Sequence, residues 1–244
     1  MFHCLKLIQI ATFSAIVSWM VFGQQASART CRILFPDRPG DAPRSLHLFD
    51  GISSQEVELP SMNLSTVYEL PAGPLNLRLL PDKVDDPSTI SPDSPSVEVP
   101  ETYTDFYLIV FGNPKNKISP VKLEVINADS ENFKPGQTLW LNKTGKTIKG
   151  KWGEQTLKLE PESSEIVNSP LDNQNATTSA YFSASFTYRI QGEAVFAPIT
   201  EQQWWFDANC RHLGFVMDSG GKLPQIYFFR DFRVTDQETQ EVPE

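Results

Sequence analysis

The chain has 244 residues, of which 40% are hydrophobic and 21% are charged, and its formal net charge is −9 at pH 7. This apolar fraction, with 16 Phe, excludes a wholly disordered chain and suffices for the core of one large or two small domains. The acidity disfavours nucleic acid and anionic membranes as partners, because neither phosphate steering nor counterion release would favour contact.

The first 28 residues have the pattern of a secretory signal peptide. Lys6 precedes a largely apolar run from Leu7 to Phe22, and small residues stand at Ala26 and Ala28, as in an Ala-x-Ala-type cleavage site. An uncleaved anchor is the alternative, since the run is near the lower limit of the roughly 17–25 residues that span a bilayer. We expect cleavage and export to the periplasm, cell surface or medium, without membrane insertion of the mature chain. That chain would keep 20 of the 21 basic residues and all 30 acidic ones, a net charge of −10.

Strand-like periodicity follows along most of the mature chain. Apolar and polar residues alternate over 75–79, 121–125, 156–160 and 182–190, a period of two that places one face of a strand on a core. The run from Tyr107 to Phe111 is apolar throughout, which is typical of a central strand covered on both faces. The sequence therefore predicts an all-β protein.

Clusters of Pro, Gly, Asp and Asn separate these runs and predict turns and loops. Many short strands at this spacing indicate antiparallel sandwiches or barrels. Long exposed loops are predicted at 81–100, which is rich in Pro, Ser and Asp, and at 160–179. Residues 236–244 are expected to form a disordered acidic tail.

A weak internal repeat indicates two domains. Segments 32–35, 46–50 and 68–73 of the first half are followed by 122–127, 139–142 and 157–161 of the second at comparable spacings. We interpret the halves as two immunoglobulin-like β-sandwiches in tandem. The first would comprise residues 29–115 and the second 120–235, with the joint near 113–120.

Six short motifs stand out along the chain: Asp41-Ala42-Pro43, Leu48-Phe49-Asp50-Gly51, Tyr68-Glu69-Leu70-Pro71-Ala72-Gly73, Val99 to Tyr107, Val125 to Asp129 and Asp231-Phe232-Arg233. Together they resemble motifs of uncharacterised exported bacterial proteins with immunoglobulin-like β-sandwich repeats. The resemblance implies an all-β sandwich fold and a location outside the cytoplasm. It brings no catalytic residues with it.

Two cysteines remain after signal removal. Cys31 and Cys210 could form a disulfide in an oxidising compartment, or they could be two unrelated buried thiols; the sequence leaves both open. Cys210 and His212 share one face of a strand, which permits an activated thiolate. We favour the interpretation that Cys210 is a half-cystine beside a partly exposed histidine.

The segment Gln203-Trp204-Trp205-Phe206 is the most unusual local feature. Adjacent residues on a strand point to opposite faces, so either Trp204 or Trp205 could be exposed. The pair could offer an aromatic surface for sugar rings or a protein partner. Packed core aromatics are the alternative, which we favour because large aromatic side chains are mostly buried.

The sequence predicts no catalytic, cofactor-binding or metal-binding residues. Only His47 and His212 remain as bases in the mature chain, and neither Gly-x-Ser-x-Gly nor His-Glu-x-x-His occurs. We therefore expect an exported, non-catalytic binding or structural assembly protein of the bacterial envelope, without a cofactor, that contacts an envelope protein or a glycan. The alternative is a carbohydrate-binding module or a carbohydrate-active enzyme built on a β-sandwich.

Overall fold

A computed structural model describes residues 28–171, 179–218, 220 and 223–232. The expected signal peptide lies outside these residues apart from Ala28, and so does the acidic tail at 236–244. Within the described part, the chain forms sixteen strands and one short 3-10 turn, η1 (Pro87–Thr89). The all-β prediction is confirmed. No helix in these residues is long and apolar enough to cross a membrane.

The first eight strands form two four-stranded sheets, which we name A and B. In spatial order, sheet A contains β4 (Tyr68–Leu70), β1 (Arg29–Leu34), β7 (Asp105–Gly112) and β8 (Val121–Asn127). Sheet B contains β3 (Ser54–Glu58), β2 (Ser45–Phe49), β5 (Leu75–Leu80) and β6 (Ser96–Val99). A common core of buried side chains from both sheets makes them a β-sandwich.

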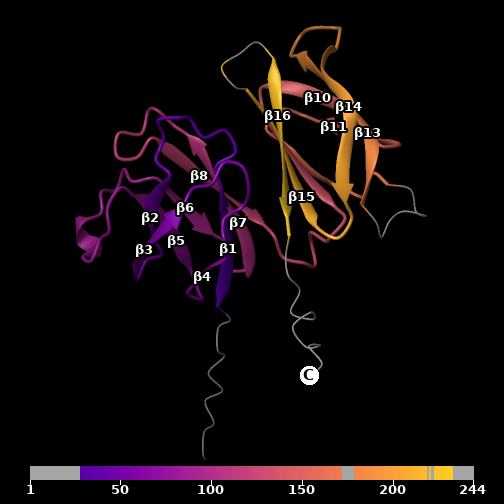
Figure 1. Cartoon of the computed structure of the whole chain (residues 1–244). Helices are drawn as coiled ribbons and strands as arrows, with labels where there is room; N and C mark the ends of the chain where they lie inside the picture. The colour runs from indigo at the N-terminus through magenta and orange to yellow at the C-terminus, as the bar shows by residue number, and fades with distance from the viewer. Residues whose placement is uncertain (1–27, 172–178, 219, 221–222, 233–244) are drawn as a thin grey trace, which may run out of the picture.

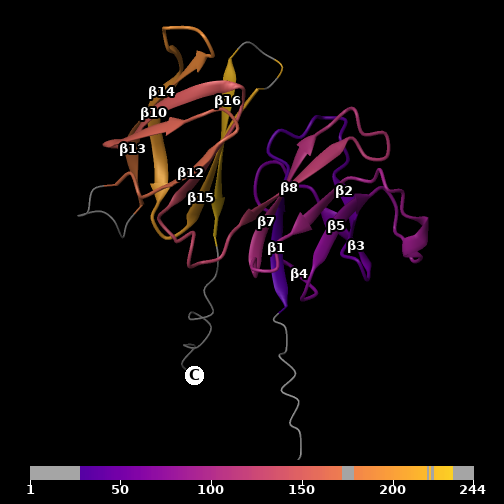
Figure 2. The same cartoon turned by 180° about the vertical axis from the view of Figure 1, so that it is seen from behind.

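The last eight strands form sheets C and D in the same way. Sheet C contains β12 (Ser164–Val167), β9 (Thr138–Lys143), β15 (Arg211–Asp218) and β16 (Pro224–Asp231). Sheet D contains β11 (Gln155–Leu159), β10 (Lys146–Trp152), β13 (Ser179–Ile190) and β14 (Ala197–Asp207). The expectation of two tandem β-sandwiches is confirmed, and they lie side by side in Figures 1 and 2.

The two sandwiches share one topology. Each strand of the second occupies the place of the strand eight positions earlier in the first, so the order β4-β1-β7-β8 recurs as β12-β9-β15-β16. One pairing in each sandwich is parallel, β1 with β7 and β9 with β15. The sandwiches are therefore not purely antiparallel as expected, because the chain visits the opposite sheet before it returns beside its first strand.

The sheet pairing corrects the position of the joint between the halves. Strand β8 was expected to open the second half, but it pairs antiparallel with β7 and completes sheet A. Residues 113–120 are thus a loop within the first sandwich, closed by a hydrogen bond from the Asn113 N–H to the Pro120 carbonyl. The segment that connects the first sandwich to the second is 128–137. The alternation in 121–125 fits an edge strand of either sandwich, so the pattern alone assigns β8 to the wrong half.

Parts of the two predicted loops are strands. Strand β6 lies within 81–100 and β12 within 160–179, whereas residues 172–178 lie outside the described part. Both strands are short edges of their sheets with mostly exposed side chains. A four-residue edge strand carries too little apolar alternation to stand out in a segment rich in Pro and Ser.

Three buried clusters join the four sheets into layers in the order B, A, C, D. One cluster lies between B and A, and one between C and D. The third contains Tyr107, Ile109 and Phe111 of sheet A with Leu141 and Phe215 of sheet C, so it joins the sandwiches themselves. This confirms that the run from Tyr107 to Phe111 is covered on both faces. The outer faces of sheets B and D remain as the broad sheet surfaces of the molecule.

Candidate functional site

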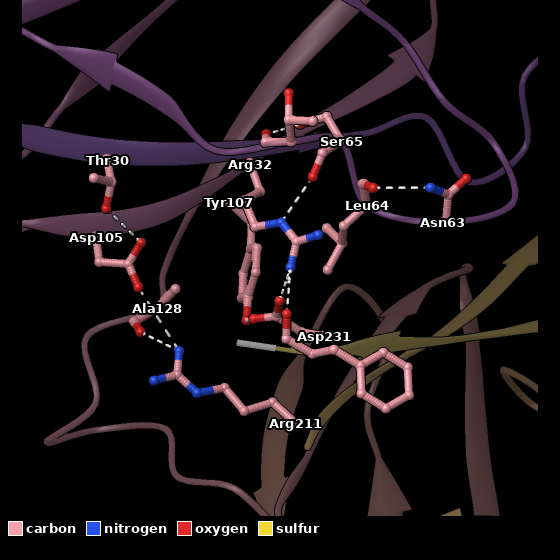
Figure 3. A network of polar contacts seen from close by, with 12 residues as sticks. Thr30, Arg32, Asn63, Leu64, Ser65, Asp105, Tyr107, Ala128, Arg211 and Asp231 are labelled. Atoms are coloured by element: carbon pink, nitrogen blue, oxygen red, sulfur yellow. Dashed lines mark hydrogen bonds and ion pairs between the residues drawn. The ribbon is translucent and has the colours of Figure 1, made fainter. Parts of the chain in front are cut away.

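Charged side chains connect the two sandwiches at their boundary (Figure 3). Arg32 of β1 forms an ion pair with Asp231, which ends β16 and is almost fully buried. The Arg32 Nε also donates to the Ser65 carbonyl at 2.8 Å, and the Tyr107 hydroxyl donates to Asp231 Oδ2 at 2.5 Å. The buried carboxylate therefore has both a countercharge and a hydrogen-bond donor.

Two further ion pairs cross the same boundary. Arg211 of β15 donates from Nη1 to the Ala128 carbonyl at 2.5 Å, and the same atom lies 3.8 Å from Asp105 Oδ2 (Figure 3). Lys143 of β9 contacts Glu124 of β8 at 2.6 Å. The polar groups of the boundary are thus occupied by one another. Their arrangement is that of an interface that holds the sandwiches together.

The Cys210–His212 pair is neutral and buried. Cys210 Sγ lies 3.6 Å from His212 Nε2, and the imidazole, with no exposed surface, is stacked between Phe206 and Phe228. Burial raises the pKa of Cys210 to about 12 and lowers the pKa of His212 to about 4. A thiolate–imidazolium pair is therefore not formed near neutral pH. The expectation of a partly exposed histidine is wrong, because aromatic neighbours from β14 and β16 cover the ring.

Cys31 and Cys210 are free thiols in the structure. Cys31 is in the core between sheets A and B, whereas Cys210 precedes β15 of the second sandwich. Burial also raises the pKa of Cys31 to about 12. Of the two alternatives left open by the sequence, the structure has two separate buried thiols.

Trp204 and Trp205 point to opposite faces of sheet D. Trp204 packs against the core between sheets C and D, where its ring lies 5.2 Å from that of Phe228. Trp205 is on the outer face and 44% exposed. Its ring contacts that of Tyr181, which is 69% exposed, edge-on at 5.0 Å. The predicted aromatic surface therefore consists of Trp205 with Tyr181, and not with Trp204; we name these two residues the aromatic pair.

A cavity of about 380 Å³ opens on the same outer face of sheet D. The inward positions of β13 are apolar, and the alternate positions Ser183 and Ser185 line the cavity. Glu201 and Gln203 of β14 and Lys151 of β10 complete its outward-facing wall. The Gln203 Nε2 donates to Ser183 Oγ at 2.6 Å. We name this concavity the sheet D cavity.

Two other cavities lie on the first sandwich. One of about 720 Å³ runs along the edge strands β3 and β4 and includes Arg38, Arg44 and Tyr68; we name it the first-sandwich cavity. Arg38 donates to the Leu59 carbonyl, and the Tyr68 hydroxyl accepts from the Glu58 N–H. A further cavity of about 570 Å³ follows the ends of β5 and β6. Neither is lined by a pair of exposed aromatic rings.

Two other titratable residues, His47 and Asp86, do not line these three cavities. His47 lies on β2 between β3 and β5, in the first sandwich. Asp86 caps η1 by accepting from the Ser88 N–H, which lowers the pKa of its carboxyl group. Within the described ranges no three His, Cys, Asp or Glu side chains are grouped to hold a metal ion.

Sequence reasoning missed Tyr181 and the residues of the sheet D cavity. The alternation of Phe182, Ala184 and Phe186 could have indicated that Tyr181, Ser183 and Ser185 share the outer face. The register that sets Tyr181 opposite Trp205 could not be read locally, because it depends on the β13–β14 pairing. No protein-family model matches the sequence, and no curated protein is similar enough to be a match.

Proposed function

We propose that the chain is an exported, non-catalytic binding protein of the bacterial envelope, built from two immunoglobulin-like sandwiches. The observation that carries this proposal is the outer face of sheet D, where an exposed aromatic pair adjoins a polar cavity. Sheet D is also the layer farthest from the first sandwich, so its outer face is open to a partner (Figures 1 and 2). Aromatic rings of this kind are typical anchors of binding surfaces.

The ionisable groups at the sandwich boundary and in the Cys210–His212 pair are paired or neutral, which also supports a binding role. The charges at the sandwich boundary pair with one another, and Cys210 and His212 are both neutral near pH 7. The boundary ion pairs, with the apolar cluster beside them, hold together the two sandwiches, one of which carries the sheet D face. Rigid presentation lowers the entropic cost of binding, which suits a protein that works through its surface.

The partner is an envelope protein or a glycan. A net charge of −9 disfavours nucleic acid, and the signal-like residues 1–28 support export. We expect the chain recovered from outside the cytoplasm to begin at Arg29, as intact mass or N-terminal sequencing would measure. An unprocessed chain confined to the cytoplasm would contradict the proposal.

Co-sedimentation with isolated bacterial envelopes tests the binding role. We expect the purified mature chain to sediment with envelopes and Trp205→Ala to lose most of that binding, because Trp205 is exposed and its removal leaves the core intact. Arg44→Ala in the first-sandwich cavity is the matched surface control and should bind as the parent does. Equal binding by all three, or none by the parent chain, would overturn the proposal.

A further inference from the structure

We infer that the outer face of sheet D binds an oligosaccharide, with one ring of the aromatic pair stacked on a sugar ring and the sheet D cavity holding hydroxyl groups of the ligand. The inference rests on the proposed binding function and names the class of ligand. It uses two features that lie together: exposed rings held in a fixed orientation, and an adjoining wall of polar side chains.

Strand register places these two features side by side. Tyr181 pairs with Trp205, and two residues along the same face Ser183 pairs with Gln203. Successive same-face positions on a strand are about 7 Å apart, which is close to the width of one sugar ring. A ring stacked on the aromatic pair therefore has its next neighbour over the sheet D cavity.

The aromatic pair is organised before any ligand arrives. The two rings meet at an interplanar angle of 69°, so each limits the rotation of the other. Both residues lie within long paired strands, Tyr181 in β13 and Trp205 in β14, and not in a loop. A platform that is already ordered loses little side-chain entropy on binding. Aromatic faces carry negative partial charge and attract the polarised C–H groups of a sugar ring.

The polar wall matches hydroxyl groups. Ser185 lies between Lys151 on β10 and Glu201 on β14, so a donor and an acceptor flank a hydroxyl in one row across the sheet. Neither Lys151 nor Glu201 takes part in an ion pair among the described residues. Hydrogen bonds to charged groups are the stronger ones, and a sugar hydroxyl both donates and accepts.

A saccharide fits this face better than a protein does. The cavity wall presents Ser, Gln, Lys and Glu, and the aromatic pair supplies exposed rings beside it. The buried centre of a protein–protein interface is depleted of charged residues. The volume of about 380 Å³ is within the range of small-ligand sites.

The test treats envelopes with periodate, which cleaves vicinal diols of sugars, or with protease, and repeats the co-sedimentation. We expect periodate to abolish Trp205-dependent binding and protease to leave it. Binding that survives periodate but not protease would overturn the saccharide inference and leave the proposed binding function standing. If untreated envelopes do not bind the parent chain, the saccharide inference and the proposed binding function both fail.

Calorimetry with short β-1,4-linked oligosaccharides of glucose and of xylose, which carry vicinal diols, refines the test. For a sugar that binds, Trp205→Ala should weaken the affinity about tenfold or more, whereas Trp205→Phe should keep most of it. Glu201→Gln should weaken it less, and Arg44→Ala should leave it unchanged. Equal affinities for the parent chain and Trp205→Ala would place the sugar elsewhere and overturn the inference.

Discussion

Tyr107 and Asp231 are 124 positions apart, yet the Tyr107 hydroxyl donates a hydrogen bond of 2.5 Å to the buried Asp231 carboxylate across the boundary between the sandwiches. Arg32 provides the countercharge from the first sandwich. Residues near both ends of the described chain therefore meet at one carboxylate. This relationship makes the arrangement of the two sandwiches sensitive to a single charge.

Asp231→Asn should lower the free energy of unfolding by about 3 kcal/mol, because it leaves the guanidinium of Arg32 without its countercharge in a largely buried setting. Tyr107→Phe should cost about 1 kcal/mol through the lost hydrogen bond. Urea unfolding followed by tryptophan fluorescence measures both. Asp218→Asn is the matched control: its ion pair with Lys146 is on the surface, and its loss should cost under about 1 kcal/mol. Equal losses for Asp231→Asn and Asp218→Asn would contradict a buried bridge.

Stability should depend on pH through His212. Its pKa is about 4 in the folded chain, against an ordinary value of 6.5, mainly because the buried ring cannot hydrate a charge. Between these values the unfolded chain binds a proton that the folded chain does not. The free energy of unfolding therefore falls as the pH is lowered from 6.5 to 4, by about 3 kcal/mol from this residue.

The substitution His212→Phe isolates that contribution. Phe can stack between Phe206 and Phe228 without titrating, so the free energy of unfolding of this variant should change less over the same pH window. Urea unfolding of both proteins at several pH values measures the difference, and the carboxylates common to both chains cancel. Parallel pH profiles would show that His212 is not buried as a neutral ring.

The sequence pattern predicts the strands far better than their partners. Alternation and the apolar run from Tyr107 to Phe111 correctly indicate strands and a doubly covered centre. That the second face of β7 is covered by sheet C depends on residues such as Leu141 and Phe215, which lie beyond the first sandwich in the chain. Local patterning records that a face is buried, and not what buries it.

At the candidate site, too, the sequence predicts the orientation of side chains but not their neighbours. Opposite orientations of Trp204 and Trp205 follow from the period of a strand, and the structure has one ring inward and one outward. The pairing of Trp205 with Tyr181 depends on the register of a long hairpin. The burial of His212 likewise depends on Phe206 and Phe228 from two other strands.

Gly214→Ala should destabilise the second sandwich by about 2 kcal/mol. A Cβ at Gly214 would lie 2.4 Å from Trp140 Cε3, and Trp140 is fully buried among other rings, so it cannot move without strain. Thermal unfolding measures the loss. Gly40→Ala is the control, since a Cβ there meets nothing within 4 Å and should change stability by under about 0.5 kcal/mol. Equal stabilities of the two variants would contradict the close packing of Trp140 on β15.

In a chain that starts at Arg29, both thiols should resist modification until the protein unfolds. Cys31 and Cys210 are buried, and with each pKa near 12 the thiolate fraction at pH 8 is on the order of one in ten thousand. Ellman's reagent should therefore find almost no reactive thiol in the native protein and two in urea without reductant. No thiol in urea would mean that the two cysteines are bonded, which contradicts their separate positions in the two sandwiches. Cys210→Ala should leave one reactive thiol in urea, which identifies the signal of each residue.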